Sequence, residues 1–342
     1  MSIRTLLLSL PLLCAAPGFA QQAAAPAPAA RVYLDVVVTP HSGAPVSGLQ
    51  QQDFTLLDNK IARPITSFTA AGGPSAPVQV LLVIDAVNAG FQTVAFERDQ
   101  IDKFLRANGG ELPFPMTLAV VTDTGTQIQN SSSHNGKELS DALDKYTVAL
   151  RTIHRSAGFY GAEDRLQLSL RALSSLTARE QTLPGRKLIL WVSPGWPLFS
   201  GPRVQMDSRQ EQSIYQQIAS FSTELRNARV TLYSIDPTGS AENTMRAQFY
   251  KQFLKGVAKP SQAELADLGL QVIATQSGGL ALTSNNDMTA MLRQALDDAS
   301  AYYELSFDPP PSDHADQYHQ LEVQVAKPGL IARTRSGYYG QP

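Results

Sequence analysis

Aliphatic runs alternate with segments of helical periodicity through the middle of the chain. Val78 to Ile84 is apolar at almost every position, as expected of a strand that is buried on both faces. Thr93 to Ala107 then places Val94, Ile101 and Leu105 on one helical stripe. Further strands are predicted at Met116 to Thr122, Arg186 to Ser193, Val230 to Ile235 and Gly279 to Leu282, and further helices at Lys137 to Leu150, Ala162 to Ala178, Gln210 to Ala228, Gln262 to Thr275 and Asp287 to Ser300. This alternation predicts a doubly wound, mostly parallel α/β domain over residues 76–300.

The two ends of this region have the pattern of short antiparallel strands. Strands are predicted at Val32 to Thr39, Asp53 to Asp58, Pro64 to Ala70, Ala301 to Phe307, Tyr318 to Ala326 and Leu330 to Tyr339. A three-stranded piece buries little apolar surface by itself. We therefore predict that a β unit at 31–72 and a second at 301–342 pair into one small antiparallel β-sandwich, with the α/β domain inserted between them.

The first thirty residues have the composition of an export signal followed by a leader. Arg4 precedes the apolar run Leu6 to Leu13, and small residues surround Phe19 before a predicted cleavage after Ala20. Residues 21–30 contain Ala, Pro and Gln and are interpreted as a disordered leader. The apolar run is shorter than the ~20 residues of a membrane helix. We expect a periplasmic or secreted protein with no integral membrane segment in the mature chain.

Charge, cysteine and histidine content exclude several classes of function. The net charge of -2 shows no basic stripe, which argues against nucleic acid. Cys14 is the only cysteine and lies in the signal peptide, so the mature chain has no disulfide. No histidine pair has the helical metal spacing, and His314 and His319 are interpreted as solvated loop residues. Motifs of nucleophilic hydrolases and phosphate-binding loops are absent, so we predict that the protein is not an enzyme.

Blocks of sequence along nearly the whole mature chain resemble the von Willebrand A-related proteins of the acidobacterial type. These blocks include Leu82-Val83-Ile84-Asp85-Ala86-Val87-Asn88, Gly185-Arg186-Lys187-Leu188-Ile189-Leu190-Trp191-Val192-Ser193-Pro194-Gly195, Leu232-Tyr233-Ser234-Ile235-Asp236-Pro237 and Arg333-Thr334-Arg335-Ser336-Gly337-Tyr338-Tyr339. The resemblance implies a Rossmann-like von Willebrand A domain. It also implies a metal-ion-dependent adhesion site at the carboxyl ends of the strands.

The metal site that the resemblance implies is degenerate in this chain. The family pattern Asp-x-Ser-x-Ser reads Asp85-Ala86-Val87-Asn88-Ala89 here, so the carboxylate is present and both hydroxyls are missing. In the loop after Trp191 only Ser193 offers an oxygen ligand, and the position of the family threonine stays open between Thr152 and Ser156. Asp123 follows a strand predicted beside that of Asp85. We expect no required cofactor; the alternative is Mg²⁺ or Ca²⁺ at Asp85, Asp123 and Ser193.

Strand-end aspartates have a second interpretation, and the same rim holds candidate binding residues. Asp123 and Asp236 can cap a following turn instead of binding a cation. Trp196 and Phe199 lie on one loop, and Tyr160 lies between glycines; each is either a binding anchor or part of a hydrophobic plug. Asn88 completes the predicted binding set.

The combined prediction is a protein-binding or adhesion module that acts through the carboxyl-edge rim of its sheet, with an unknown protein partner of the cell envelope or the extracellular space. Two alternatives stay open. One is metal-dependent adhesion through Asp85, and the other is a structural subunit of an envelope assembly that uses the β-sandwich.

Overall fold

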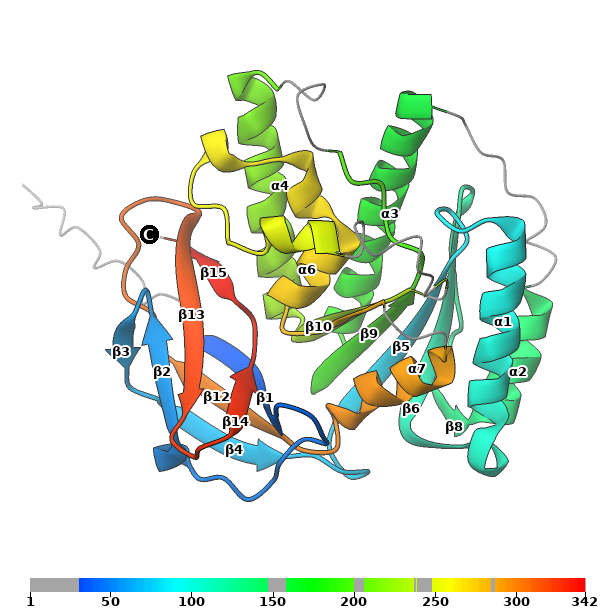
Figure 1. Cartoon of the computed structure of the whole chain (residues 1–342), viewed down its shortest axis with the longest axis horizontal. Coiled ribbons are helices and arrows are strands. Elements are labelled where there is room, and N and C mark those ends of the chain that lie inside the picture. The colour runs from blue at the N-terminus through cyan, green and yellow to red at the C-terminus, as the bar shows by residue number, and fades with distance from the viewer. Residues whose placement is uncertain are drawn as a thin grey trace, which may run out of the picture.

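The computed structural model describes residues 31–146, 158–199, 206–236, 238, 248–283 and 287–341, and these residues form three β-sheets (Figure 1). In the seven-stranded sheet, five strands run parallel to one another in the order β11-β10-β9-β5-β6. These strands are β5 (Val78–Asp85), β6 (Glu111–Thr122), β9 (Arg186–Val192), β10 (Val230–Ile235) and β11 (Ala281–Leu282). Two short strands, β7 (Gly125–Ile128) and β8 (Ser133–Asn135), pair antiparallel with β6 at the edge.

Both faces of the seven-stranded sheet are covered by helices, which explains the aliphatic runs of its strands. In β5, Leu82 and Ile84 belong to the core on one face, whereas Leu81 and Val83 belong to the core on the other. The first face packs against α1 (Phe91–Arg106), α2 (Gly136–Lys145) and α7 (Met288–Asp297), and the second against α3 (Gly158–Gln181), α4 (Ser208–Asn227) and α6 (Leu270–Gln276). Short 3₁₀ helices are η1 (Gln51–Asp53), η2 (Ala107–Gly110), η5 (Tyr250–Phe253), η6 (Pro260–Gln262) and η7 (Leu265–Leu268).

Strands from the two ends of the described chain form two four-stranded antiparallel sheets. One has the order β14-β1-β12-β4 and the other β15-β13-β2-β3, and a separate apolar core is built from their side chains. The register places Val32 opposite Phe307 and Val37 opposite Arg333. The strands are β1 (Val32–Pro40), β2 (Phe54–Asp58), β3 (Ile61–Arg63), β4 (Ser67–Ala71), β12 (Tyr302–Phe307), β13 (Gln317–Val325), β14 (Leu330–Arg333) and β15 (Gly337–Gly340).

The predicted fold class, a doubly wound, mostly parallel Rossmann-like von Willebrand A domain inserted in a small antiparallel β-sandwich, is wrong. The chain has mixed α/β content: two complete four-stranded antiparallel sheets stand beside a seven-stranded sheet that is itself mixed. The short antiparallel strands β3, β7 and β8 carry no run of alternating apolar residues, so no periodic pattern indicates them. The proposed domain limits, including the segments at 1–20 and 21–30 that lie outside the described residues, stay a prediction.

Buried polar contacts join the α/β part to the antiparallel sheets. The carboxylate of Asp298 accepts hydrogen bonds from Tyr233 on β10 and from Arg333 on β14, each at 2.5 Å. Arg186 at the start of β9 donates to the Asp298 carbonyl at 2.8 Å, and its guanidinium lies 4.7 Å from the centre of the Tyr302 ring. Because these groups are largely removed from water, each needs its partner, and the junction is fixed in one arrangement.

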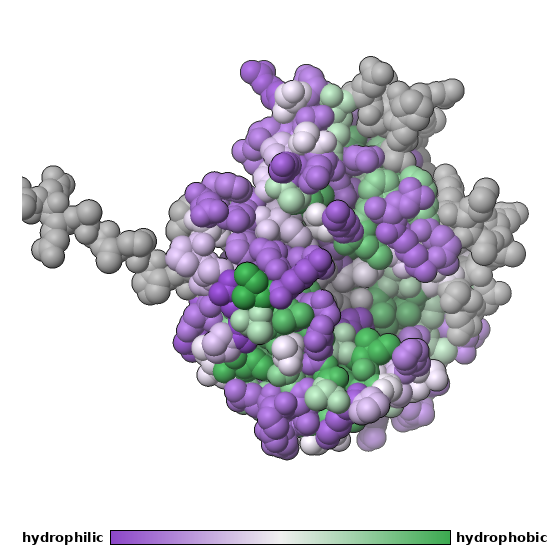
Figure 2. All heavy atoms as spheres, turned by 60° about the vertical axis from the view of Figure 1, so that its left-hand side comes forward, coloured by the Kyte–Doolittle hydropathy of each residue, from purple (hydrophilic) through white to green (hydrophobic). Residues whose placement is uncertain are grey.

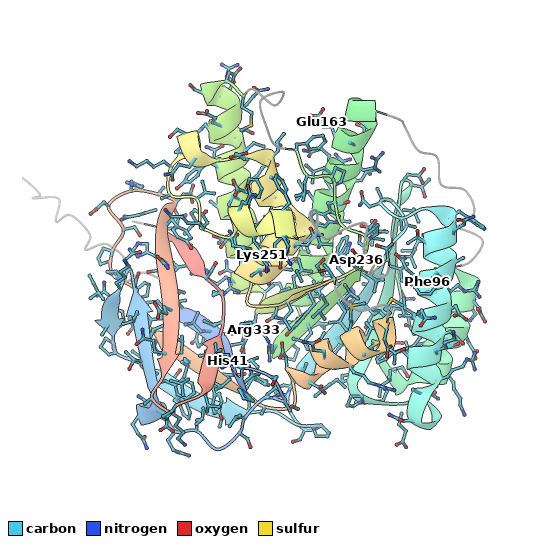
Figure 3. The ribbon with its side chains drawn as sticks, in the orientation of Figure 1. His41, Phe96, Glu163, Asp236, Lys251 and Arg333 are labelled. Carbon is cyan, nitrogen blue, oxygen red and sulfur yellow. The ribbon has the colours of Figure 1, made fainter. Side chains whose placement is uncertain are left out.

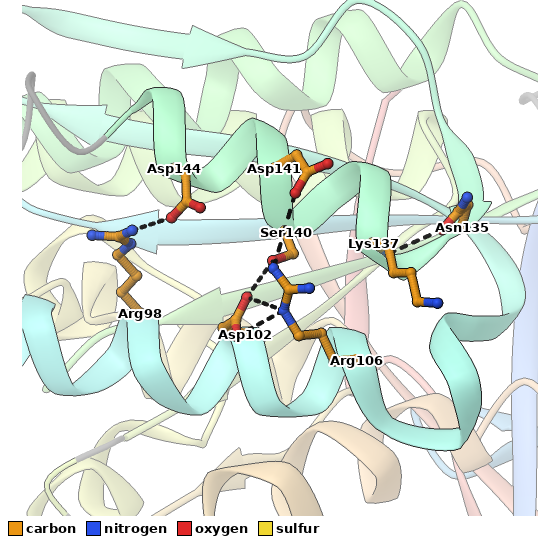
Figure 4. A network of polar contacts seen from close by, with 8 residues as sticks. All are labelled: Arg98, Asp102, Arg106, Asn135, Lys137, Ser140, Asp141 and Asp144. Carbon is orange, nitrogen blue, oxygen red and sulfur yellow. Dashed lines mark hydrogen bonds and ion pairs between the residues drawn. The ribbon is translucent and has the colours of Figure 1, made fainter.

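A surface network of charged residues joins α1 to α2 (Figure 4). Arg106 on α1 holds Asp102 one turn earlier at 3.0 Å and donates to Ser140 on α2 at 2.6 Å. Ser140 in turn donates to Asp102, and Arg98 pairs with Asp144. Burial alone would raise the pKa of Asp102, but the bonds from Ser140 and Arg106 hold it below its usual value. Exposed pairs of this kind contribute little individually and here mainly fix the α1–α2 contact.

Candidate functional site

Asp85 ends β5 at the carboxyl edge of the seven-stranded sheet, and its side chain is fully buried. Its Oδ1 accepts from the backbone N–H groups of Val87 and Asn88, both at 3.0 Å. Its Oδ2 accepts from Asn88 Nδ2 at 2.9 Å, Trp191 Nε1 at 3.1 Å and Ser193 Oγ at 2.9 Å. An ionised carboxylate offers about four lone-pair positions. Five internal donors therefore occupy this carboxylate completely, and it serves to hold the ends of β5 and β9 together.

Asn88 and Ser193 extend this network rather than facing an open site. Asn88 also donates to Ser169 on α3 at 2.8 Å, and Ser193 Oγ accepts from the backbone N–H of Gly195 at 3.1 Å. The Asn88 Oδ1 atom is buried and has no partner among the described residues. The side chains of Asp85, Asn88 and Ser193 thus come together, as a closed hydrogen-bonded cluster.

The remaining predicted metal ligands are more dispersed. Asp123 lies partly buried in the turn between β6 and β7, two positions beyond the residue that pairs with Asp85. Asp236 accepts from the backbone N–H of Thr238 at 2.8 Å and from its hydroxyl at 2.6 Å, which is the turn-capping arrangement. Within the described ranges, no three His, Cys, Asp or Glu side chains are placed to hold a metal ion. The metal set of Asp85, Asp123 and Ser193 remains a prediction.

Two of the aromatic residues predicted as binding anchors, Trp196 and Phe199, lie in the interior of the protein. Trp196 is 4% exposed and Phe199 is 9% exposed, and both belong to the core under α3 and α4. The Trp196 ring meets the Trp191 ring edge-on, with 5.3 Å between centroids. This is the hydrophobic-plug arrangement, so neither ring presents a surface to a partner. Tyr160 belongs to the first turn of α3, but its side chain, like Thr152 and Ser156, lies outside the described residues.

Glu97 is a residue of this region that the sequence interpretation missed. It lies on α1, is fully buried, and neither carboxylate oxygen has a hydrogen-bond partner among the described residues. Burial raises its pKa well above the usual value, and the negative charges of Asp85 and Asp236 raise it further. A signal was present: Glu97 interrupts the stripe formed by Val94 and Ile101 at a position where an apolar residue is expected.

Two exposed aromatic residues follow directly after the Asp85 cluster. Phe91 begins α1 and is 65% exposed, and Phe96, five positions further along, is 42% exposed. Figure 3 labels Phe96 on α1 and Asp236 beyond the end of β10. Phe91 stands at the carboxyl edge because the turn that connects β5 to α1 is short. Exposed rings close to a hydrogen-bonded cluster are suited to contact with another molecule.

An open cleft is lined by η5, η7 and the segment that connects them. Its volume is about 560 Å³, and Phe249 and Phe253 line it with Lys255 and Asp267. The two phenylalanine rings are 5.4 Å apart and meet edge-on. Burial raises the pKa of Asp267 to about 7, a backbone bond from Glu264 opposes this rise, and the Glu264 charge adds to it. The helix predicted at Gln262 to Thr275 covers only the end of this lining, and the sequence pattern did not indicate the cleft.

His319 corrects the interpretation of the histidines. It lies in β13, is 4% exposed, and is not a solvated loop residue. Its Nδ1 is 2.9 Å from Asp58 Oδ1, and its Nε2 is 3.4 Å from Ser312 Oγ. The order resembles that of a nucleophilic triad. Ser312, however, is only 8% exposed, and the Tyr338 ring stacks on the imidazole with 4.7 Å between centroids. We therefore interpret Asp58, His319 and Ser312 as a buried network that stabilises the second antiparallel sheet.

Comparisons with known proteins place the chain only loosely. No family model matches it, and no curated protein matches it, so membership of the von Willebrand A-related group stays a prediction. Among solved structures it is similar to proximal thread matrix protein 1 from the mussel byssus, with 14% identity, a TM-score of 0.36, and coverage of 71% of this chain and 51% of that one. The chain is also similar to the pilus adhesin SpaC from Lactobacillus rhamnosus GG, with 10% identity, a TM-score of 0.37, and coverage of 86% of this chain and 49% of that one.

A variant of the PilB minor pilin from Streptococcus sanguinis gives 11% identity, a TM-score of 0.35 and 78% coverage of each chain. The chain spans about half the length of the first solved structures it matches, with 51%, 44% and 49% of each covered. None of these neighbours is described as a von Willebrand A domain. The names given above describe the neighbours and not this chain. No helix in the described part of this chain is long and apolar enough to cross a membrane.

Proposed function

We propose that this protein is an exported, non-enzymatic binding protein that contacts a protein partner through the rim at the carboxyl edge of the seven-stranded sheet, without a metal ion. The observation that carries the proposal is the closed state of Asp85, whose five internal donors leave no lone pair for a cation. The exposure of Phe91 and Phe96 beside this cluster supports the same rim as the contact surface. We therefore propose Phe91 and Phe96 as the binding anchors in place of Trp196 and Phe199.

The shape of the rim favours binding over catalysis. Asp85 and Ser193 are both fully buried, and their hydrogen-bonding groups are engaged with each other, so neither faces a substrate. Glu97 is buried beneath the same cluster and is held toward its neutral form. Rings on a rigid support lose little conformational freedom on association, which favours recognition of a preformed partner surface.

The alternative of a structural envelope subunit rests on the antiparallel sheets. Tyr33, Ile61 and Ile331 are 52%, 58% and 48% exposed on strands of these sheets. Figure 2 turns this side forward and shows hydrophobic side chains gathered between hydrophilic ones. β3 and β4 are also edge strands whose outer sides have no strand neighbour among the described residues. Edges of this kind are able to pair with another chain.

Site-specific photo-crosslinking separates these possibilities. A photoreactive phenylalanine analogue replaces Phe91 on the rim, Tyr33 on the antiparallel sheets, or Phe253 in the cleft, in cells that make the protein naturally. The proposal expects one defined protein adduct from position 91 that persists in EDTA. Adducts from position 33 alone would instead support the structural subunit, and an adduct from 253 alone would move the contact to the cleft.

Loss of the position 91 adduct in EDTA would support metal-dependent adhesion and contradict the metal-free proposal. A matched pair of variants completes the test. Phe91→Ser should abolish partner binding, because it removes an exposed ring without disturbing the core. Ile61→Ser, which removes a side chain of similar exposure from β3, should leave binding unchanged.

A further inference from the structure

A small cavity with mostly polar walls lies where the α/β part meets the antiparallel sheets. Three arginines line it: Arg226 near the end of α4, Arg229 just before β10, and Arg335 between β14 and β15. We call this space the arginine cavity. Its volume of about 10 Å³ is close to the minimum of roughly 10–15 Å³ that one water-sized particle needs. Tyr33 also lines it and is 52% exposed, so the cavity lies next to solvent.

The three guanidinium groups have more hydrogen-bond donors than the surrounding protein has acceptors. Arg335 is 7% exposed and makes no hydrogen bond or ion pair with the described residues. The Nε atoms of Arg226 and Arg229 are both buried and lack partners in the same part of the chain. Arg226 instead faces the Tyr338 ring at 5.8 Å. Since an unpaired buried donor costs free energy, a ligand that accepts hydrogen bonds would relieve the Nε atoms of Arg226 and Arg229 and give the guanidinium group of Arg335 a partner.

The charges around the cavity leave an excess of positive charge. Arg229 pairs with Asp35 at 2.5 Å and with Glu304 at 2.6 Å, and no carboxylate pairs with Arg226 or Arg335 within the described ranges. Two carboxylates therefore face three guanidinium groups. Burial and the neighbouring Arg226 lower the pKa of Arg335 to about 10. The pKa of Lys187 on β9 is also lowered, first by burial and then by the positive charge of Arg229.

Hydroxyl groups in the walls show which donors are still available. Ser277 donates to the Ala274 carbonyl and Thr334 to the Asp35 carbonyl, so both hydroxyl protons are already used. Thr231 is buried, lines the cavity, and makes no side-chain hydrogen bond within the described residues. A ligand in the cavity would thus meet guanidinium N–H groups and one free hydroxyl. This set of donors recognises an anion.

The backbone at Arg229 has a conformation that is strained for a residue with a side chain. Its φ of +53° lies in the left-handed region, directly after the last turn of α4. Helices commonly end with such a residue, and glycine is the usual choice because a side chain is strained there. Here the position carries an arginine that reaches Asp35 and Glu304 and lines the cavity.

We propose that the arginine cavity binds one small monatomic anion of the size of chloride, held by Arg226, Arg229, Arg335 and Thr231. The bound anion neutralises the excess charge and joins α4 and β10 to the segment between β14 and β15. An organic acid does not fit, because the cavity has room for about one water-sized particle. The proposal is independent of the function assigned to the rim.

Thermal unfolding of the mature chain, at constant ionic strength with gluconate replacing chloride, provides the first test. The unmodified protein should show a Tm that rises by a few degrees and saturates with chloride, because a ligand that binds only the folded state stabilises it. Arg335→Met should lose this dependence while keeping the volume of the side chain. The matched control Arg171→Met, at an exposed arginine on α3, should keep it.

Diffraction from crystals of the unmodified protein soaked in bromide provides the second test and does not depend on the folding of a variant. An anomalous peak between Arg226, Arg229 and Arg335 is expected. A Tm that is insensitive to chloride, or one equally sensitive in Arg335→Met, would overturn the proposal. Ordered water without bromide in the cavity would do the same.

Discussion

Replacing Glu97 with Gln should remove a pH dependence that this one buried side chain gives to the whole protein. Its carboxylate is fully buried on α1, neither oxygen has a partner within the described residues, and its pKa is raised well above 4.5. The folded protein therefore keeps a proton that the unfolded chain has lost. The stabilising contribution is complete below the unfolded pKa and is lost as the pH rises toward the folded pKa.

The magnitude follows from the number of protons involved. One extra proton on the folded state changes the free energy of unfolding by about 1.4 kcal/mol for each pH unit. Between pH 5 and 6, the unmodified protein should therefore lose about 1.4 kcal/mol relative to Glu97→Gln, which has no titrating group at this position. The amide preserves the volume, so the packing of α1 against the sheet should change little.

Urea unfolding followed by circular dichroism at half-unit steps from pH 5 to 7 measures this difference. Glu163→Gln is the matched control, because Glu163 is an exposed glutamate on α3 (Figure 3) and its removal should leave the pH profile unchanged. Parallel pH profiles for the unmodified protein and Glu97→Gln would refute the reasoning. In that case Glu97 would be ionised in the folded state, through a partner or a water molecule.

Three further predictions concern the site, the cleft and a turn. Asp85→Ala should lower the free energy of unfolding by at least about 3 kcal/mol in chemical denaturation, because it leaves buried donors unpaired, and calorimetric titration of the unmodified protein with Mg²⁺ or Ca²⁺ should give no saturable heat. Asp267→Asn should have the same free energy of unfolding as the unmodified protein near pH 4 and exceed it at pH 8 by at most about 4 kcal/mol. The reason is that the pKa of Asp267 is raised to about 7, so ionisation of the buried aspartate destabilises the folded state as the pH rises from 4 to 7. Gly185→Ala should cost more than about 1 kcal/mol in the same denaturation, since φ is +77° and a Cβ would lie 1.8 Å from the Pro77 carbonyl oxygen.

Much of the central sheet was predictable because its strands are apolar on both faces. The strand expected at Val230 to Ile235 agrees with β10, and that at Arg186 to Ser193 differs from β9 by one residue. Where the pattern was weak, the prediction was wrong. The helix expected over Gln262 to Thr275 instead contains the end of η6, then η7 and α6, with Gly269 separating the last two. The added Cβ of a larger residue there would meet Leu198 at 2.5 Å, a tertiary constraint that periodicity does not report.

Predictions for the site depended on which way side chains point, and periodicity says little about that. The prediction grouped Ser193 with Asp85 as metal ligands, and in the structure Ser193 and Asn88 both donate hydrogen bonds to Asp85. Whether these residues bind a metal ion stays a prediction. The loop position of Trp196 gave no information about whether its ring faces inward. Glu97 was missed because α1 was treated as a uniform apolar stripe, although one acid within such a stripe is a strong signal in itself.

The pairing of β1 with strands from the opposite end of the chain determines the order in which this protein can fold. Arg31 and Asp308 are 277 positions apart and yet form an ion pair beside the first pair of this register. During synthesis, β1 has no partner until β12 and β14 have emerged, so its apolar face must wait unpaired while the central sheet forms from nearer neighbours. Contacts of such long sequence separation form slowly. The antiparallel sheets should therefore be the last part to assemble and the part most in need of protection from aggregation on the way.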